Sequence, residues 1–392
     1  MERALYISYF GLREPLVQTQ VLPYLRALAA GGTTIFLLTF EPERRKRWDR
    51  ASLARTREQL RGEGIEWLTS AYHKRPSLPA TLFDVAAGAL RTIALVRRHG
   101  IDIIHARSHV PALMGAIAKP FTRAKLLFDI RGLMADEYAD SGHWRAGGLL
   151  YRLTKYVERW LFRSTDGFVI LTERARRELF ANETRPVEVI PTCIDPARFA
   201  RGAGVPPAGR ARRPPPSTTV VYAGSLGGAY LVKELAEFFA VAKECDPRVY
   251  PMILTHSDPS LIDVDGFVGF VEPDELPSYL ASADIAVSIV KPGYSKIATS
   301  PTKFAEYLAA GLPVISTRGI GDIEAQIERE RVGVLLDGLD RDSYRRAFDE
   351  IRELRRDPSL PERCRALALR EYDLHSVGAV RYGRIYAKLG ER

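Results

Sequence analysis

Cysteine is scarce in this chain, and long hydrophobic runs are missing. Cys193, Cys245 and Cys364 are the only cysteines among 392 residues, and no two of them have C-x-x-C spacing. This scarcity excludes a disulfide framework and a cysteine-type zinc site, and it suits a reducing cytosol. No uninterrupted apolar run reaches the ~18 residues of a membrane span. The N-terminal "MERALYISYF" lacks the apolar core of a signal peptide. We therefore expect a cytoplasmic protein.

The motifs of several ligand classes are also missing. No G-x-G-x-x-G follows a predicted strand, since "GSLGG" at 224–228 has a different spacing, which disfavours a dinucleotide-dependent dehydrogenase. Neither a helix-turn-helix nor an RNA-binding signature is present, which disfavours a nucleic-acid-binding protein. We assign no acidic pair to a metal, and we predict no metal requirement.

Positive charge is concentrated in the first half of the chain. The chain has 57 Lys and Arg against 48 Asp and Glu, a net charge of +9. Residues 1–200 hold 31 of the basic and 21 of the acidic residues, so the remainder is close to neutral. Such a distribution indicates an anionic partner: a nucleic acid, a phosphorylated substrate or an acidic lipid surface. An arginine-rich source proteome would give the same numbers, so both explanations stay open.

Short apolar or β-branched runs alternate with longer segments of helical periodicity. The runs expected as strands are 4–9, 34–40, 101–106, 125–131, 167–172 and 187–191, then 218–224, 250–255, 265–271, 284–290, 312–317 and 333–336. Strands separated by helices form parallel sheets that are covered on both faces. Between the two series, residues 201–217 are dense in Pro, Gly and Arg, which is typical of a linker. The sequence thus predicts an α/β protein with two Rossmann-like domains that face each other across a cleft.

The stretch "SPTKFAEYLAAG" predicts an anion-binding helix start. Pro301 ends the preceding loop and favours a helix start nearby, and Ser300 or Thr302 is placed to cap the exposed N–H groups. A helix N-terminus attracts phosphate, and Lys303 adds a full positive charge. Glu306 lies one turn deeper on the same face, where a carboxylate can accept hydrogen bonds from two ribose hydroxyls. These groups fit a sugar nucleotide, but an ordinary amphipathic helix with a solvated Lys and Glu has the same pattern.

Several segments together resemble the family 4 glycosyltransferases, which are retaining enzymes of the GT-B fold. "SPTKFAEYLAAGLPVISTRGIG" is similar to their donor-site segment, and "VVYAGSLG" to the turn after the first strand of the donor domain. "FVGFVEPDELPSYLASADIAVS" resembles the stretch that faces the base, while "VILTERARREL" and "VEVIPTCIDPARF" resemble the end of the N-terminal domain. The resemblance implies an acceptor domain at 1–200, completed by a C-terminal helix at 376–392, and a donor domain at 218–375.

The chain departs from the family pattern at the donor site. The first glutamate of the family's Glu-x7-Glu pattern falls at Ala298, and Ser225 replaces an arginine that usually binds the diphosphate. Lys233 is one candidate for the diphosphate-binding lysine, and Lys291, Lys296 and Lys303 are substitutes. The residues that the resemblance implies for the nucleotide sugar are Gly224, Ser225, Lys233, Phe270, Val271, Thr299, Ser300, Pro301, Thr302, Lys303 and Glu306.

In the N-terminal domain the family's Gly-rich loop is reduced to Gly11, with Arg13 and Gln18 nearby. We assign these three residues and His105 to substrate binding, although Arg13 also fits a surface arginine and a lone His is more often structural. Arg131 takes the place of a family His that contacts the sugar. Because arginine keeps its proton in proteins, Arg131 would act as an electrostatic clamp. The catalytic candidates are Arg131, Asp129, His109 and Lys303, with an Asp129–Arg131 structural pair as the alternative.

Two segments are candidates for a membrane surface. The amphipathic segment 147–164 sets Tyr, Trp, Leu and Phe among Arg and Lys, as helices on anionic membranes do. A helix packed on its own sheet shows the same pattern, and we favour that interpretation. The basic segment 41–64 is the stronger candidate, although a solvated helix would look alike. A peripheral contact with the inner face of an anionic membrane is therefore an open expectation.

From the resemblance we predict a hexosyltransferase-type, retaining glycosyltransferase. It would move a sugar from a nucleotide diphosphate sugar, UDP-sugar before GDP-sugar, to an unknown hydroxyl of a sugar, lipid-linked or small-molecule acceptor. Polysaccharide biosynthesis and natural-product glycosylation are the expected settings, with no cofactor beyond the donor. Two alternatives stay open: a sugar-nucleotide epimerase on the same GT-B fold, and a basic nucleic-acid-binding protein.

Overall fold

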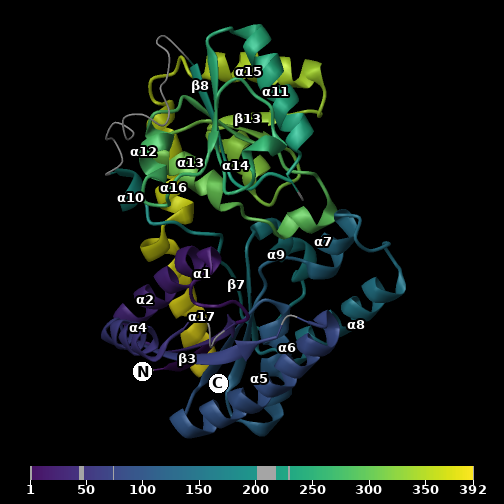
Figure 1. Ribbon diagram of the computed structural model, residues 1–392. Coiled ribbons are helices and arrows are strands. Elements are labelled where there is room, and N and C mark those ends of the chain that lie inside the picture. The colour runs from purple at the N-terminus through teal and green to yellow at the C-terminus, as the bar shows by residue number, and fades with distance from the viewer. Residues whose placement is uncertain (1, 44–47, 74, 201–217, 228–229, 392) are drawn as a thin grey trace. The chain divides into compact units, whose positions relative to one another are not determined.

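The computed structural model describes residues 2–43, 48–73, 75–200, 218–227 and 230–391 (Figure 1). The expected linker at 201–217 lies outside the described residues. The chain divides into two compact units, Met1–Ile190 with Leu374–Arg392, and Pro191–Asp373. Each unit is described below by itself.

The first unit is built on a seven-stranded parallel sheet of order β3-β2-β1-β4-β5-β6-β7. Its strands are β1 Arg3–Ser8, β2 Thr34–Pro42, β3 Ile65–Tyr72, β4 Ile103–Arg107, β5 Lys125–Asp129, β6 Gly167–Ile170 and β7 Val187–Val189. The central strands are almost wholly buried, because parallel sheets are covered on both faces. The sheet order reverses direction between β1 and β4, which is the switch point where open α/β sheets bind ligands.

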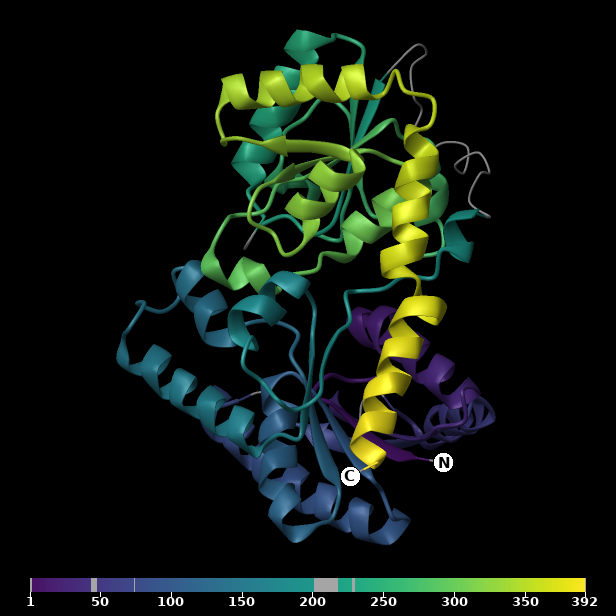
Figure 2. The ribbon, with the colours of Figure 1, turned by 180° about the vertical axis from the view of Figure 1, so that it is seen from behind.

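Helices cover both faces of this sheet. They are α1 Pro15–Gln20, α2 Leu22–Ala30, α4 Arg50–Gly62, α5 Ser77–His99, α6 His109–Ala118, η1 Lys119–Phe121, α7 Met134–Asp140, α8 Leu149–Ser164, α9 Glu173–Leu179, η4 Leu374–Ala379 and α17 Val380–Gly390. Helix α6 contacts both α5 and α8, so these three form one layer. The C-terminal η4 and α17 return to this unit, where η4 packs beside α2 and α17 contacts β4 and β7 (Figure 2).

The second unit has a six-stranded parallel sheet of order β10-β9-β8-β11-β12-β13. Its strands are β8 Thr218–Ala223, β9 Val249–Leu254, β10 Phe267–Gly269, β11 Ile285–Ser288, β12 Val314–Thr317 and β13 Gly333–Leu336. Its helices are α10 Ala197–Ala200, α11 Val232–Cys245, η2 Pro259–Leu261, α12 Leu276–Ala281, η3 Tyr294–Ala298, α13 Thr302–Ala310, α14 Ile323–Glu330, α15 Arg341–Leu354 and α16 Leu360–Tyr372. Two hydrophobic clusters fill this unit, one around α13 and α16 and the other around α11 and α15.

The predicted α/β class with two Rossmann-like parallel sheets is confirmed, and every run expected as a strand overlaps an observed strand. One strand escaped prediction. In β3, Ile65, Trp67 and Thr69 are buried in alternation with partly exposed residues, which is the period-2 signal of a strand. Among the described residues, one helix segment, Leu78–His99, is long and apolar enough to cross a membrane by length and composition alone. Core helices of soluble proteins pass the same test.

Candidate functional site

The turn after β8 and the start of α13 come together at the carboxyl edge of the second sheet. Gly224 follows β8 with a φ of +146°, a conformation that side chains other than glycine rarely adopt. A Cβ atom at this position would lie 2.6 Å from Nζ of Lys303. Only glycine therefore lets the lysine of α13 reach the end of β8.

Lys303 is 6% exposed, and its Nζ has no hydrogen-bond partner among the described residues. The ammonium group lies 4.1 Å from the ring centroid of Tyr222 and 4.1 Å from that of Tyr230. The two aromatic rings stabilise the charge through cation–π contacts, but they provide no counter-ion. Burial lowers the pKa of Lys303 from 10.5 to about 7, although the carboxyl group of Glu306 opposes the shift. The site thus holds a desolvated cation.

Glu306 lies one turn further along α13 than Lys303. Burial raises the pKa of its carboxyl group from 4.5 to about 7, while Arg198 and Lys303 favour the charged form. No ion pair joins Glu306 to another described residue. A carboxylate in this position can accept hydrogen bonds from a ligand without first losing a partner.

The loop before α13 differs from the prediction in one respect. Pro301 occupies the N-cap position, and no side chain caps the helix, so the prediction that Ser300 or Thr302 does so is wrong. Ser300 serves another segment: its Oγ accepts a hydrogen bond from the backbone N–H of Thr192 at 3.1 Å. Thr299 and Thr302 are partly exposed, and Ala298 is fully buried in η3. No carboxylate is therefore available where the family has its first glutamate.

The remaining donor candidates are spread around this edge of the unit. Ser225 is exposed, and its backbone carbonyl accepts a hydrogen bond from the hydroxyl of Tyr222 at 2.6 Å. Lys233 is exposed in the first turn of α11. The ring of Phe270 is 44% exposed beside His256, and Val271 is buried. Of the expected residues, the structure brings Gly224, Lys303 and Glu306 together, with the lysine buried.

The first unit has a buried charge cluster where β4 and β5 end. Asp129 is fully buried and accepts a hydrogen bond from the hydroxyl of Tyr382 at 3.0 Å. Its carboxylate lies 3.4 Å from Nε2 of His105, 3.5 Å from Nη1 of Arg131 and 3.7 Å from Nη1 of Arg107. Burial alone would raise the pKa of Asp129, but Arg131, His105 and Arg107 hold it well below its usual range.

His105 is positioned by its other ring nitrogen. Nδ1 lies 2.7 Å from the hydroxyl of Tyr386 on α17, and burial lowers the pKa of the ring. Because the ring is fully buried, it is not open to a substrate. His105, Asp129 and Arg131, three predicted site residues, are thus parts of one network with the C-terminal helix.

His109 does not belong to this network. It is buried at the first residue of α6, with Nε2 3.2 Å from Oε1 of Glu158 on α8. Burial raises the pKa of Glu158, but His109 and Lys155 more than offset this and lower it. Ser108, just before His109, has a φ of 71° and a ψ of 179°, which is a strained backbone for a residue other than glycine. The sequence gives no signal for that strain.

The loop after β1 is organised by a residue that the sequence analysis passed over, Glu41. Its Oε1 accepts a hydrogen bond from the N–H of Leu12 at 2.8 Å, and a Cβ at Gly11 would lie 2.9 Å from its Oε2. The guanidinium of Arg13 stacks on Trp48, 4.0 Å from the ring centroid, and Nε2 of Gln18 donates to the carbonyl of Leu12 at 2.6 Å. Gly11, Arg13 and Gln18 therefore shape this loop.

The family model described as Glycosyltransferase Family 4 matches residues 17–198, and the one described as Glycosyl transferases group 1 matches residues 256–353. The two matches lie in sequence order and cover most of the chain. The chain belongs to the family 4 glycosyltransferases.

Solved structures support the GT-B fold of this glycosyltransferase. A glycosyltransferase from Rickettsia africae ESF-5 aligns with a TM-score of 0.69 and 14% identity over 99% of this chain and 98% of that one. Sucrose-phosphate synthase from Thermosynechococcus elongatus aligns with a TM-score of 0.69 and 18% identity over 99% of both chains. Anabaena HepE in complex with UDP-glucose aligns with a TM-score of 0.63 and 13% identity over 99% of this chain and 100% of that one. No curated protein matches the glycosyltransferase in sequence.

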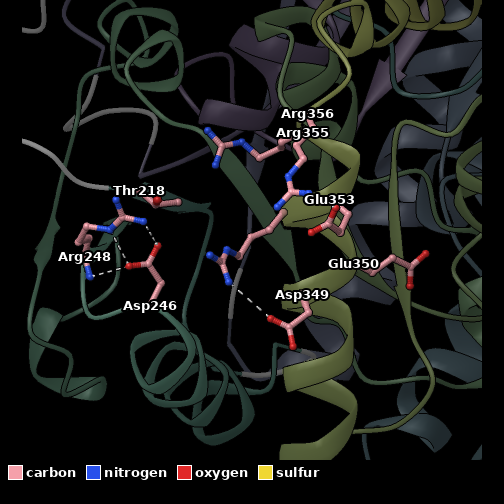
Figure 3. Close-up of a pocket in the computed structure, with 9 residues that line it drawn as sticks. Thr218, Asp246, Arg248, Asp349, Glu350, Glu353, Arg355 and Arg356 are labelled. Atoms are coloured by element: carbon pink, nitrogen blue, oxygen red, sulfur yellow. Dashed lines mark hydrogen bonds and ion pairs between the residues drawn. The ribbon is translucent and has the colours of Figure 1, made fainter.

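A hollow at the opposite edge of the second unit is a poor candidate for the donor site. It lies beside Thr218, the first residue of β8, and is lined by residues of α15 and by Asp246 and Arg248 (Figure 3). A six-residue strand spans about 20 Å, so this hollow is far from Gly224. Arg248 is paired with Asp246 at 2.9 Å, and Arg352 with Asp349 at 3.6 Å. The cations that line the hollow already have carboxylate partners.

The described residues of the glycosyltransferase contain no set of three or more His, Cys, Asp or Glu side chains that could hold a metal ion. A D-x-D sequence does occur at 263–265, which the sequence analysis passed over. Asp265 is exposed there and forms an ion pair with Lys243. Asp265 is therefore already paired with a lysine.

Proposed function

We propose that this glycosyltransferase is a retaining enzyme that takes its sugar from a nucleotide diphosphate sugar, with UDP favoured over GDP, and needs no metal ion. The observation that carries the proposal is the buried ammonium of Lys303 behind Gly224, for which the described part of the chain offers no hydrogen-bond partner. A desolvated cation that lacks a counter-ion attracts a ligand that brings negative charge with it. The UDP-glucose bound by Anabaena HepE, which shares the fold, supports a nucleotide sugar as that ligand.

The diphosphate would lie at the start of α13. The helix start is not capped by a side chain, so its dipole and the Lys303 ammonium would act on the diphosphate together. When the bond between the sugar C1 and the diphosphate oxygen breaks, negative charge builds up on the leaving group. Lys303 would stabilise this charge at the moment it forms, which is the part that a metal ion plays in other enzymes.

Glu306 would bind the ribose. Its carboxylate lies one turn from the lysine, and accepting hydrogen bonds from two adjacent hydroxyls would orient the nucleotide. The acceptor oxygen then forms a new bond to C1 on the face that the diphosphate leaves, and the acceptor proton passes to the departing diphosphate. This is the retaining course that the family resemblance implies. The protein's contribution is positioning and charge stabilisation, without a protein nucleophile.

The acceptor would be a hydroxyl of a sugar, a lipid-linked sugar or a small molecule, as in polysaccharide or natural-product assembly. The basic first 200 residues favour an acceptor that carries negative charge.

The test is a binding panel of UDP, GDP, ADP and dTDP in the presence of EDTA, followed by incubation with the matching nucleotide sugars. We expect one nucleotide diphosphate, UDP first, to raise the melting temperature in EDTA. Slow release of sugar with the anomeric configuration of the donor, seen by NMR, would support retention. If none of the four nucleotides binds, or if binding returns only with Mg²⁺ or Mn²⁺, the proposed donor site is wrong.

A further inference from the structure

Exposed hydrophobic side chains gather on one helical layer of the first unit. Helix α6 lies between α5 and α8, and α8 is at the outer side of this unit (Figure 1). Most of the large hydrophobic residues that are exposed anywhere in the described chain belong to this layer or to η1, which contacts α6: Leu78, Leu82, Phe83, Leu90, Ile117, Phe121, Leu149, Leu150, Leu153, Tyr156 and Trp160. Scattered exposed hydrophobics are normal, but such a concentration marks an interaction surface.

On α8 these residues form a single stripe. Leu149, Leu153, Tyr156 and Trp160 are spaced by four, three and four residues, so they lie along one line of the helix. Their exposed fractions are 83%, 56%, 64% and 38%. The favoured sequence interpretation, in which the apolar side of this helix packs on its own sheet, is therefore wrong for the stripe. We call Leu149, Leu153, Tyr156 and Trp160 the α8 stripe.

The opposite side of α8 explains why the stripe faces outward. Leu161 is fully buried, and Glu158 is buried next to His109 of α6. Lys155 lies 2.8 Å from Glu158 and 3.1 Å from Asp136 of α7. The helix is therefore attached to the unit by an ionic cluster and a few apolar contacts, which leaves its aromatic and leucine side chains free.

The charges around the α8 stripe are of one sign. Arg152, Arg159 and Arg163 are exposed beside it, and none of the three has an ion-pair partner within the described part of the chain. The carboxylates carried by α5, α6 and α8 are Asp84 and Glu158, and both are buried. The surface of this layer thus offers apolar groups and cations with no accessible acid.

We propose that the outer face of α5, α6 and α8 docks on an anionic lipid bilayer, with the α8 stripe inserted at the headgroup level. A helix with aromatic and leucine side chains on one line and arginines beside that line suits this position. Its arginines extend to the phosphates while their stems cover apolar surface, and Trp and Tyr favour the interface. A second copy of the chain is a poorer occupant, because pairing the same surface would bring arginines against arginines.

The test is cosedimentation of the full chain with vesicles of phosphatidylcholine alone and with about one third phosphatidylglycerol. We expect binding to the anionic vesicles, at least tenfold weaker binding to the neutral ones, and weakening by salt, since the Debye length falls from about 30 Å at 0.01 M to 10 Å at 0.1 M. The variant Leu153→Ser/Trp160→Ser should lower the affinity for anionic vesicles at least tenfold. Arg152→Ser/Arg159→Ser should lower it and also flatten the salt dependence.

The matched control is Leu369→Ser, which removes an equally exposed leucine (51%) from α16 in the other unit and should leave vesicle binding unchanged. Circular dichroism and thermal melting report whether each variant is folded. The proposal is overturned if the wild type ignores anionic vesicles, if it binds both kinds equally, or if Leu369→Ser weakens binding as much as the stripe variant. It is also overturned if the stripe variant converts a dimer to a monomer without lipid, because a second copy then covers the surface.

Discussion

The side-chain nitrogen of Lys303 lies 4.1 Å from the ring centroid of Tyr222, in a place where the described residues offer it no hydrogen-bond acceptor. The free protein therefore bears the cost of a buried charge for which the described residues supply no hydrogen-bond partner. A charge of this kind destabilises the free protein and favours the complex with an anion. Removing the charge of Lys303 should therefore change both the stability of the free protein and its affinity for the nucleotide.

Replacing Lys303 by an uncharged residue of similar length should stabilise the second unit. We expect Lys303→Met to raise the melting temperature by about 2–4 °C, since removing a buried unpaired charge is worth at least ~1 kcal/mol in a unit of this size. The same variant should bind UDP at least tenfold more weakly. Thermal melting with and without UDP measures both effects.

The stabilisation should depend on pH in a defined direction. The pKa of Lys303 is lowered from 10.5 to about 7 in the folded protein, so the cost of the charge is complete below pH 7 and disappears as the pH approaches 10.5. The advantage of Lys303→Met should shrink over that interval. Lys233→Met, at an exposed position, serves as the control and should leave the melting temperature unchanged. Loss of UDP affinity in Lys233→Met, with normal affinity in Lys303→Met, would move the diphosphate site to Lys233.

Nucleotide binding should take up a proton above neutral pH. At pH 8 most of the Lys303 amine is neutral in the free protein, and an adjacent diphosphate would restore its charge. We expect an uptake of about one proton per UDP, because the terminal phosphate, with a second pKa near 6, is already ionised. Calorimetric titration at pH 8 in two buffers with different ionisation enthalpies measures this number.

Glu306 provides the control for this experiment. The pKa of its carboxyl is raised to about 7, so Glu306 is largely ionised at pH 8 in the free protein. Glu306→Gln should therefore keep the proton uptake, whereas Lys303→Met should lose it. An uptake that persists in Lys303→Met would assign the proton to another group and contradict the proposed role of the lysine.

Glu306→Ala should weaken UDP binding by tenfold or more, because a charge-assisted hydrogen bond to ribose contributes about 1.5–3 kcal/mol. A comparison of UDP with a nucleotide that lacks one ribose hydroxyl tests this role more directly. If the carboxylate binds the ribose hydroxyls, the substitution should cost affinity for UDP but little for 2′-deoxy-UDP. Equal losses for both nucleotides, measured by calorimetry, would make Glu306 a structural residue.

Asp129→Asn should strongly destabilise the first unit. The substitution leaves the buried guanidinium groups of Arg107 and Arg131 without their carboxylate, and breaking a buried pair costs about 3–5 kcal/mol. The pKa of Asp129 lies below its ordinary 3.8, so its contribution is complete above that pH and is lost in stronger acid. Urea unfolding should show a deficit at pH 7 that narrows below pH 4.

The control for Asp129 is Asp337→Asn on the surface of the other unit. The Asp337 side chain is 62% exposed, so its ion pair with Arg318 contributes little to stability. An Asp129→Asn protein as stable as this control would mean that the cluster is not a structural core. If Asp129→Asn folds, its rate of sugar transfer would also show whether Asp129 contributes to the reaction.

The fold could be predicted because each strand is a short apolar run between segments of helical period. β3 was missed since Glu66, Ser70 and Tyr72 interrupt its apolar pattern, although the buried residues alternate. At the proposed donor site, Gly224, Lys303 and Glu306 were predicted through the resemblance to a known pattern. The packing of Tyr222 and Tyr230 around the lysine was not, because it joins residues about 80 positions apart and depends on the three-dimensional fold.

Exposure was the least predictable property. The pattern of residues 149–164 is the same whether its leucines and aromatics face the sheet or the solvent, and the choice depends on Glu158, which pairs with His109 inside the unit. A buried carboxylate on a helix is rare, so a sequence rule would have placed Glu158 outside. Likewise, His105 and Asp129 looked like open site residues, whereas both are fully buried and contact two tyrosines of α17.

The C-terminal helix should be required for the first unit to fold stably. Tyr382, Ile385, Tyr386 and Leu389 of α17 are buried, and the Tyr386 hydroxyl contacts the ring of His105. The glycine at 383 lowers the intrinsic helicity of this segment by ~1 kcal/mol, so its helical state depends on this packing.

A chain that ends at Ala379 should lose hydrogen-exchange protection in β1, β4 and β5 but keep UDP binding in the second unit. A chain that lacks only Glu391 and Arg392 is the control and should behave as the wild type. Tyr386→Phe, which removes the hydroxyl alone, should cost about 1–3 kcal/mol because a buried partner is left unpaired. Unchanged protection in the truncated chain would mean that the first sheet is stable without α17.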